Sequence, residues 1–260
     1  MRIAKGSESF TRDRTIRFEE CGVATYLTHI FKPETDAVQV RYMQLGPWGQ
    51  VLPHFHIADQ YQVFVNGSGT FGKSAIGPLS VHYADRYTPY GPIRINGEGL
   101  SWYTVRLARD PGAAYLPEAR PLQAEKPGRT ITHSADLPPV LDSRRQIPVM
   151  ERHPDGVGAR LEVVPQGESI SLAAPAGIGG EIHILLRGSI EAGGEAWGRQ
   201  TCLHLVPGDS WSGKAGADGA LILVLGFRTG ADKVDPAVLA KASEMEISKR
   251  IAAAKLEPAM

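Results

Sequence analysis

The chain has 260 residues, enough for one large domain or two small ones, and its 28 Lys and Arg balance its 28 Asp and Glu. A net charge of zero argues against a general nucleic-acid or anionic-membrane binding surface, because both need a basic excess. The two cysteines, Cys21 and Cys202, form no CxxC pair, so we expect neither a disulfide framework nor a thiolate zinc site. The N-terminus lacks an apolar signal segment and no apolar run approaches about 18 residues, so we expect a cytoplasmic protein without a membrane span.

Short runs rich in Val, Ile, Tyr and Trp dominate the first half of the chain. They cover residues 37–45, 60–65, 79–83, 93–95 and 100–108. Turn sequences such as GPWG, NGSG and NGEG separate them. Strands at a spacing of about 8–12 residues with turns between them predict an all-β sandwich or barrel.

From residue 110 to residue 147 the pattern changes, since prolines are frequent and there is little periodicity. This segment is predicted to be a long connector. Strand-like runs then return at 159–167, 180–190, 201–211 and 220–227. The tail at 235–255 predicts a helix, since Asp235 can cap it and Pro236 suits the first helical position.

The two strand-rich halves resemble each other. They align without a gap at an offset of 121 residues. Aligned pairs are Gly67 with Gly188, Gly46 with Gly167, Val40 with Leu161, Gln60 with Glu181 and Phe64 with Leu185. An internal duplication of a small β-barrel explains this pattern.

The segment LPHFHIADQYQVFVNGSG, residues 52–69, holds the strongest chemical signal. Alternation along a strand places His54 and His56 on one face, with Phe55 opposite. Gln60 and Gln62 share a face of the next strand and lie near the histidines if that face points inward. Because histidine is the commonest metal ligand, the cluster is either a metal site or a buried polar network that satisfies itself.

The stretch HFHIADQYQVFVNG resembles the first motif of the cupin superfamily, with His54, His56 and Gly67 in register and Gln60 where glutamate is usual. ADRYTPYGPIRI resembles the second motif, with Arg94 in the place of the third histidine. The resemblance implies an all-β chain of two tandem cupin barrels, a double-stranded β-helix or jelly roll each, with a C-terminal α-helix. The expected parts are a barrel at 1–110 that carries the site, a connector at 111–146, a degenerate barrel at 147–230, and the helix and tail at 231–260.

The same resemblance implies a small-molecule metalloenzyme of the dioxygenase, decarboxylase or isomerase class, acting on an organic or aromatic acid. His54 and His56, with Gln60 as a weak third ligand, would hold a divalent Fe, Mn, Ni or Zn ion. The candidate catalytic residues are Arg94, Gln62 and Tyr103. Tyr90 and His82 are further candidates to complete the site, although alternation from Val81 predicts that His82 points outward.

Arg94 leaves an alternative open. If Arg94 faces the pocket, its guanidinium can bind a carboxylate or phosphate through two hydrogen bonds. If it lies on the surface, it pairs with Glu98. In the first case a metal-independent cupin binds or senses a small anionic or sugar ligand, and His54 or His56 can act as a general base.

In the second repeat Pro175 and Gly177 stand where the two histidines stand in the first, while Glu181 and His183 retain polar character. We expect this barrel to be structural or to support dimerisation. The expected partners are a small anionic substrate and a second copy of the chain, since the terminal helix and edge strands need cover. No nucleic acid or membrane is expected.

Overall fold

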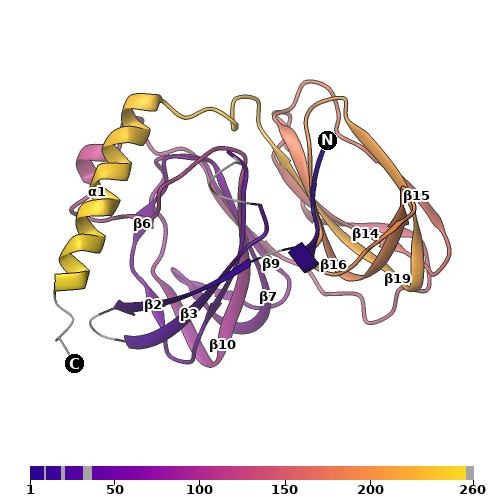
Figure 1. Cartoon of the computed structure of the whole chain (residues 1–260), viewed down its shortest axis with the longest axis horizontal. Coiled ribbons are helices and arrows are strands. Elements are labelled where there is room, and N and C mark those ends of the chain that lie inside the picture. Colours follow the sequence, from indigo (N-terminus) through magenta and orange to yellow (C-terminus); the bar gives the residue numbers. More distant parts are fainter. Residues whose placement is uncertain (9, 19–20, 32–36, 256–260) are drawn as a thin grey trace.

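The computed structural model describes the chain except residues 9, 19–20, 32–36 and 256–260, and the side chains of 10–18, 21–29 and 246–255 are likewise outside the description. Two β-barrels lie side by side, and one helix flanks the first barrel on the side away from the second (Figure 1). The predicted all-β class with a single C-terminal helix is confirmed. No helix in the described part of the chain has both the length and the apolar character needed to span a membrane.

The first barrel is built on an antiparallel sheet of nine strands in the order β12-β9-β7-β10-β4-β3-β2, with β5 paired to β10 and β8 paired to β7. Its strands are β2 (Phe10–Phe18), β3 (Cys21–His29), β4 (Gln39–Leu45), β5 (Gln50–Val51), β7 (Gln60–Phe71), β8 (Ser74–Ile76), β9 (Ser80–Ala84), β10 (Ile93–Arg106) and β12 (Thr130–Ser134). A separate pair, β6 (His54–Phe55) with β11 (Ala114–Tyr115), adds to it, and short 3-10 helices η1 (Gly6–Glu8) and η2 (Arg120–Leu122) lie in the loops.

The second barrel is built on a sheet of eight strands in the order β1-β18-β16-β19-β14-β13, with β15 paired to β19 and β17 paired to β16. Its strands are β1 (Arg2–Ala4), β13 (Arg145–Met150), β14 (Gly158–Val164), β15 (Ser169–Ala173), β16 (Gly180–Ala192), β17 (Glu195–Trp197), β18 (Cys202–Leu205) and β19 (Ser210–Phe227). The helix α1 (Pro236–Lys255) follows, and the Asp235 carboxylate accepts a hydrogen bond from the Ala237 N–H at 2.8 Å, which caps it as the sequence predicts.

The strand pairing departs from the expected domain boundaries at both ends of the first barrel. β1, at the very N-terminus, pairs with β18 of the second barrel. β12, inside the predicted connector, pairs with β9 of the first barrel. Strand partners rather than sequence proximity therefore decide which barrel these segments join.

The repeat is visible in two matching glycine contacts. A Cβ on Gly67 would lie 2.0 Å from the Gly99 carbonyl oxygen, and one on Gly188 would lie 1.9 Å from that of Gly219. These close backbone approaches, each at positive φ, require glycine.

The predicted offset of 121 residues does not extend to the neighbouring strands. Leu100 and Ala220 pair with the two equivalent glycines, Gly67 and Gly188. On their other side they pair with Leu45 and Val164, so the offset there is 119 residues. Val40 thus matches Ala159 rather than Leu161, because the second repeat has two more residues between the equivalent strands.

The largest apolar core lies between the barrels, not inside either one. It joins outward-facing side chains of β7, β9 and β10, such as Tyr61, Val81 and Tyr103, to those of β14, β16 and β19, such as Leu161 and Leu223. Strands of these sheets are therefore buried on both faces, one against the other barrel and one toward the barrel interior.

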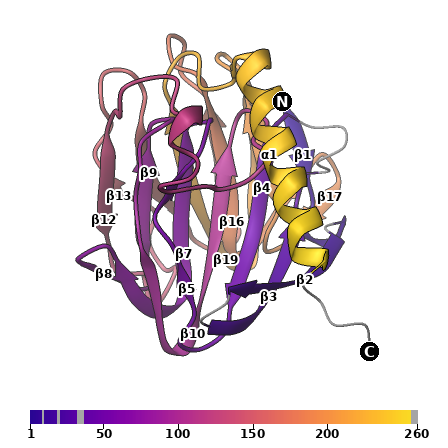
Figure 2. The same ribbon diagram turned by 90° about the vertical axis from the view of Figure 1, so that its left-hand side faces the viewer.

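The helix α1 packs on the first barrel of its own chain (Figure 2). Val238, Leu239, Ala242 and Met245 contact a cluster that includes Phe55. The first barrel of the same chain thus covers these four side chains, and the homodimer stays a prediction.

Candidate functional site

Two rows of polar side chains cross the interior of the first barrel. The first polar row consists of Gln39, Arg106 and Gln60, on β4, β10 and β7. The second polar row consists of Arg41, Thr104, Gln62, His82 and Thr132, which are successive cross-strand partners on β4, β10, β7, β9 and β12. Beyond it the interior becomes apolar, with Phe64 and Trp102 at the next inward positions. Gln60 and Gln62 both lie in these inward rows, so the condition under which the sequence placed them near the histidines is met.

His54 and His56 lie beside the first polar row and are 3% and 7% exposed, while Phe55 between them points into the apolar cluster under α1. The two imidazole rings are 5.2 Å apart, so both histidines face the same side, as predicted. His54 Nδ1 is 2.7 Å from the Leu52 carbonyl oxygen and donates to it. The Tyr90 ring lies 4.5 Å from the His54 ring.

Arg106 is the central residue of this site, and the sequence analysis missed it. Its guanidinium is 2% exposed. One terminal nitrogen, Nη2, lies 3.1 Å from each ring nitrogen of His56 and donates to Gln60 Oε1. The other, Nη1, donates to Gln39 Oε1 at 3.1 Å. The available signal was the alternation of Trp102, Thr104 and Arg106 at the end of a long strand.

Asp110 is the second residue that the sequence analysis missed, because it lies at the start of the predicted connector. Its carboxylate is 1% exposed and accepts from His56 Nδ1 at 2.8 Å and from the Ile57 N–H at 3.0 Å. It also lies 3.8 Å from Arg106 Nη1. These contacts fix the His56 tautomer with its proton on Nδ1, which leaves the lone pair on Nε2. Because Arg106 Nη2 is equally far from both ring nitrogens, it lies against the face of the imidazole and not in line with that lone pair.

Burial and charge keep the histidines neutral and the aspartate ionised. Burial, followed by the neighbouring His56, lowers the pKa of His54 to about 3. Burial, followed by the charge of Arg106, lowers the pKa of His56. Burial disfavours the charged form of Asp110, but His56 and Arg106 outweigh that effect and hold the pKa of this carboxyl well below its usual value.

The residues present do not fit a resident divalent metal ion. Gln60 Oε1 already accepts from the guanidinium of Arg106, which is always charged, cannot ligate, and lies against the face of His56. In the described residues, no three or more His, Cys, Asp or Glu side chains are placed to hold a metal ion together. The metal assignment of His54, His56 and Gln60 stays a prediction.

The second polar row contains buried atoms that lack a hydrogen-bond partner. They include Gln62 Oε1 and His82 Nε2, and Arg106 Nε in the first row shares this property. His82 is fully buried and its Nδ1 lies 2.8 Å from Thr132 Oγ1. The expectation that His82 points outward is wrong, because its neighbours Val81 and Tyr83 take the opposite face and pack between the barrels.

Arg94 and Tyr103, two of the predicted catalytic residues, lie outside the barrel interior. Arg94 is exposed on β10, between the buried Ile93 and Ile95, so of the two alternatives the surface position is correct and the catalytic role inside the pocket is wrong. Tyr103 is buried, but its ring lies 5.0 Å from that of Tyr42 in the core between the barrels. The inward positions of β10 are those of Trp102, Thr104 and Arg106 instead.

The interior of the second barrel is mostly apolar and contains the hydrogen-bonded chain of Glu181, His183 and Trp211. Leu172, Ile190, Trp197 and other apolar residues fill it. His183 Nε2 donates to Glu181 Oε2 at 2.9 Å, and Trp211 Nε1 donates to His183 Nδ1 at 2.9 Å.

The second oxygen of the Glu181 carboxylate pairs with arginine side chains. Oε1 accepts from Arg152 and lies 3.5 Å from a terminal nitrogen of Arg160. Burial opposes ionisation of Glu181, but these partners and His183 lower its pKa. With both carboxylate oxygens and both imidazole nitrogens engaged, this pair stabilises the barrel rather than offering a free base.

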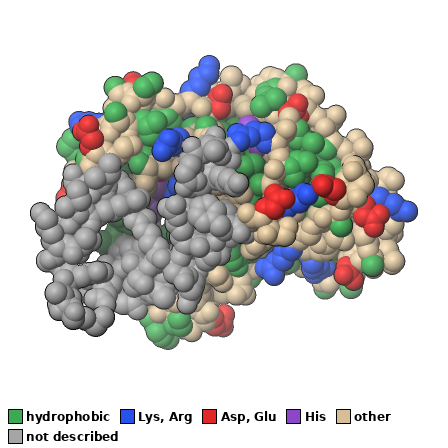
Figure 3. Space-filling view, viewed as in Figure 1, with side chains coloured by type: hydrophobic (Ala, Val, Ile, Leu, Met, Phe, Trp, Pro, Cys, Tyr) green, Lys and Arg blue, Asp and Glu red, His purple; other side chains and the backbone are tan. Residues whose placement is uncertain are grey.

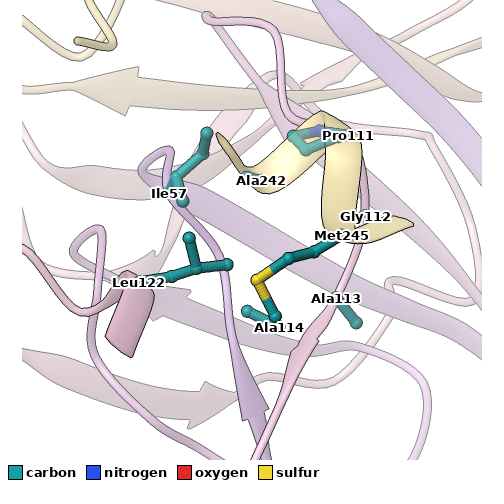
Figure 4. A pocket seen from close by; sticks show the side chains of 8 residues that line it. All are labelled: Ile57, Pro111, Gly112, Ala113, Ala114, Leu122, Ala242 and Met245. Atoms are coloured by element: carbon teal, nitrogen blue, oxygen red, sulfur yellow. The ribbon is translucent and has the colours of Figure 1, made fainter. Parts of the chain in front are cut away.

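The helix α1 covers the outer side of the loop that holds Asp110. Ala242 and Met245 face Ile57, Ala114 and Leu122 around a pocket of about 10 Å³, room for about one water molecule (Figure 4). The Ile57 and Gly112 N–H groups, which donate to Asp110, belong to the same segments. The helix therefore packs on the backbone that orients the His56–Asp110 pair.

Several solved structures share this architecture. A putative dioxygenase from Nostoc punctiforme matches with a TM-score of 0.59 at 13% identity, over 90% of this chain and 84% of that one. A nickel(II)-bound bacterial pirin from Escherichia coli matches at 0.55 and 12%, over 88% and 99%. Oxalate decarboxylase from Bacillus subtilis matches at 0.53 and 12%, over 87% and 76%. The fold is that of a cupin. At these identities the likeness to the three cupin proteins shows the fold alone.

No family model and no curated protein sequence matches the chain. The residues inside the first barrel are therefore the basis for the function. On the face shown in Figure 3, basic and acidic described side chains are interspersed, in keeping with the zero net charge.

Proposed function

We propose that the first barrel binds a small organic anion and that His56, held by Asp110, acts on it by proton transfer without a metal ion. The observation that carries this proposal is the buried guanidinium of Arg106, which contacts both His56 and Gln60. It is the metal-independent alternative that the sequence leaves open, with Arg106 in the role first given to Arg94.

The hydrogen-bonding capacity of Arg106 supports an anionic ligand. Arg106 lies 3.8 Å from Asp110 and is the buried cation of the site, where the histidines are held neutral. Arg106 Nε, which is buried without a hydrogen-bond partner, offers an additional donor to a carboxylate.

The His56–Asp110 pair has the geometry of a general base. Asp110 holds the proton on Nδ1 and can stabilise the imidazolium that forms when Nε2 takes a proton. Burial and the charge of Arg106, which lies against the face of the imidazole, lower the pKa of His56. An anion bound to Arg106 would offset that charge and raise the pKa of His56 toward its ordinary value. Ligand binding would thus make His56 a stronger base.

A metal-dependent activity of the dioxygenase, decarboxylase or isomerase class is the second candidate. Two adjacent neutral imidazoles favour it. So do the cupin relatives, which include a nickel-bound pirin and an oxalate decarboxylase with manganese(II) centres. It requires Arg106 to leave His56 and Gln60.

We expect the wild-type protein to exchange a carbon-bound proton next to the carboxylate of at least one small organic acid for deuterium in D₂O. The measurement is proton NMR on a panel of such acids, with and without a chelator. Since His56 Nε2 accepts the proton, His56→Gln should slow exchange by about 100-fold or more, within the range attributed to a positioned base. His133→Gln, at an exposed histidine of β12, is the matched control. Exchange that the chelator abolishes and added metal restores supports the second candidate instead.

A further inference from the structure

The second polar row has no role in the function proposed above. Its members Thr104, Gln62 and His82 lie side by side on β10, β7 and β9. Inward positions two residues apart along a strand are about 7 Å apart, so this row lies one layer from Arg106 and Gln60 toward the apolar end of the barrel.

Gln62 and His82 each have a buried polar atom without a hydrogen-bond partner. Gln62 is 4% exposed and His82 is 0% exposed, and neither Gln62 Oε1 nor His82 Nε2 has a hydrogen-bond partner. Buried polar atoms rarely lack a partner, because the free-energy cost is comparable to that of a lost hydrogen bond. The two residues are direct cross-strand partners, so the two atoms come from neighbouring positions.

The two atoms together match a hydroxyl group. Gln62 Oε1 is an acceptor only and needs a donor. His82 Nδ1 lies 2.8 Å from Thr132 Oγ1, and when the threonine hydroxyl donates, the imidazole proton is on Nε2. A hydroxyl can donate to Gln62 Oε1 and accept from His82 Nε2, whereas an ionised carboxylate has no proton to give to Gln62.

We propose that Gln62 and His82 form a hydroxyl-recognition subsite, so that the anion bound beside Arg106 is a hydroxycarboxylate. This inference rests on the proposed anion-binding function and narrows its ligand class. Gln62 is then a binding residue rather than a catalytic one.

The test uses pairs of acids that differ by one hydroxyl group. Binding to the full-length protein is measured by calorimetry for malate and succinate, lactate and propionate, and citrate and tricarballylate. We expect the hydroxylated member of at least one pair to bind at least roughly tenfold more tightly, because its absence leaves both buried atoms unpaired.

Gln62→Met and His82→Phe remove the two atoms at similar side-chain volume. We expect each variant to lose the preference for the hydroxylated acid while its affinity for the other acid stays within about twofold. Gln44→Met, at an exposed glutamine of β4, is the matched control. Thermal melting checks that the variants fold, and in the wild type the ¹⁵N shift of His82 Nε2 should move with malate but not with succinate.

The possible outcomes separate the hydroxyl subsite from the anion site. Equal binding of both members of every pair to the wild type overturns the subsite and leaves the anion site standing. A preference that survives in both variants, or a loss of both acids in folded variants, also overturns it. If no acid binds the wild type, the anion site and the subsite are both wrong.

Discussion

Asp110→Asn is expected to lower the free energy of unfolding by about 3–5 kcal/mol at neutral pH, the range found when one partner of a buried ion pair is removed. The carboxylate is the acidic partner of Arg106 at 3.8 Å and of His56 at 2.8 Å, and it is 1% exposed. The amide keeps the shape but not the charge, so Arg106 becomes a buried cation without its counterion. Urea unfolding of both proteins measures the effect, with the same slope of unfolding free energy against urea concentration expected for each.

The effect of Asp110→Asn should depend on pH in one direction. The pKa of Asp110 is lower in the folded chain than in the unfolded chain, where it is about 3.9. Its contribution is therefore fully present above that value and is lost as the pH falls below it. The difference between wild type and variant should shrink from about pH 5 downward. Asp136→Asn, at an exposed aspartate, should change stability by no more than about 0.5 kcal/mol. A difference that does not vary with pH would contradict the assigned pKa direction.

Arg106→Met is expected to weaken the binding of organic acids such as malate by about 100-fold or more, equivalent to about 2.7 kcal/mol. The methionine approximates the length of the arginine but carries no charge and no N–H donor. The pairing of Arg106 with His56 and Gln60 is also removed, and His56 loses the cation that lowers its pKa. Calorimetry on the variant and the wild type measures the change.

Arg94→Met is the control for this experiment, because Arg94 lies on the same strand but is exposed. It should leave acid binding within about twofold of the wild type. Loss of binding in Arg94→Met with retention in Arg106→Met would return the anion-binding role to the residue that the motif spacing first indicated.

The fold was largely predictable because local and repeated signals agreed. Turn sequences separated runs of β-forming residues, and the capped helix began where Asp235 and Pro236 placed it. The pairing of β1 with the second barrel was not predictable, because three residues at the N-terminus carry no periodic signal.

The site was predictable only in part, because the rule that apolar residues face inward failed. His82 and Tyr103 lie on strands with both faces buried, one against the other barrel. The apolar Val81 therefore marks the contact between the barrels and not the barrel interior. Motif spacing correctly brought His54, His56 and Gln60 together, but it indicated Arg94 for the basic residue, whereas tertiary packing places Arg106 there.

The most direct test of the central claim is the metal content of the wild-type protein, purified without a histidine tag and measured by elemental mass spectrometry. We expect no near-stoichiometric transition metal, even after anaerobic incubation with Fe(II), Mn(II), Ni(II) or Zn(II), because the Arg106 cation contacts His56 and donates to Gln60 Oε1. A near-stoichiometric metal that is absent from the His54→Ala/His56→Ala double variant would contradict it and establish the metalloenzyme.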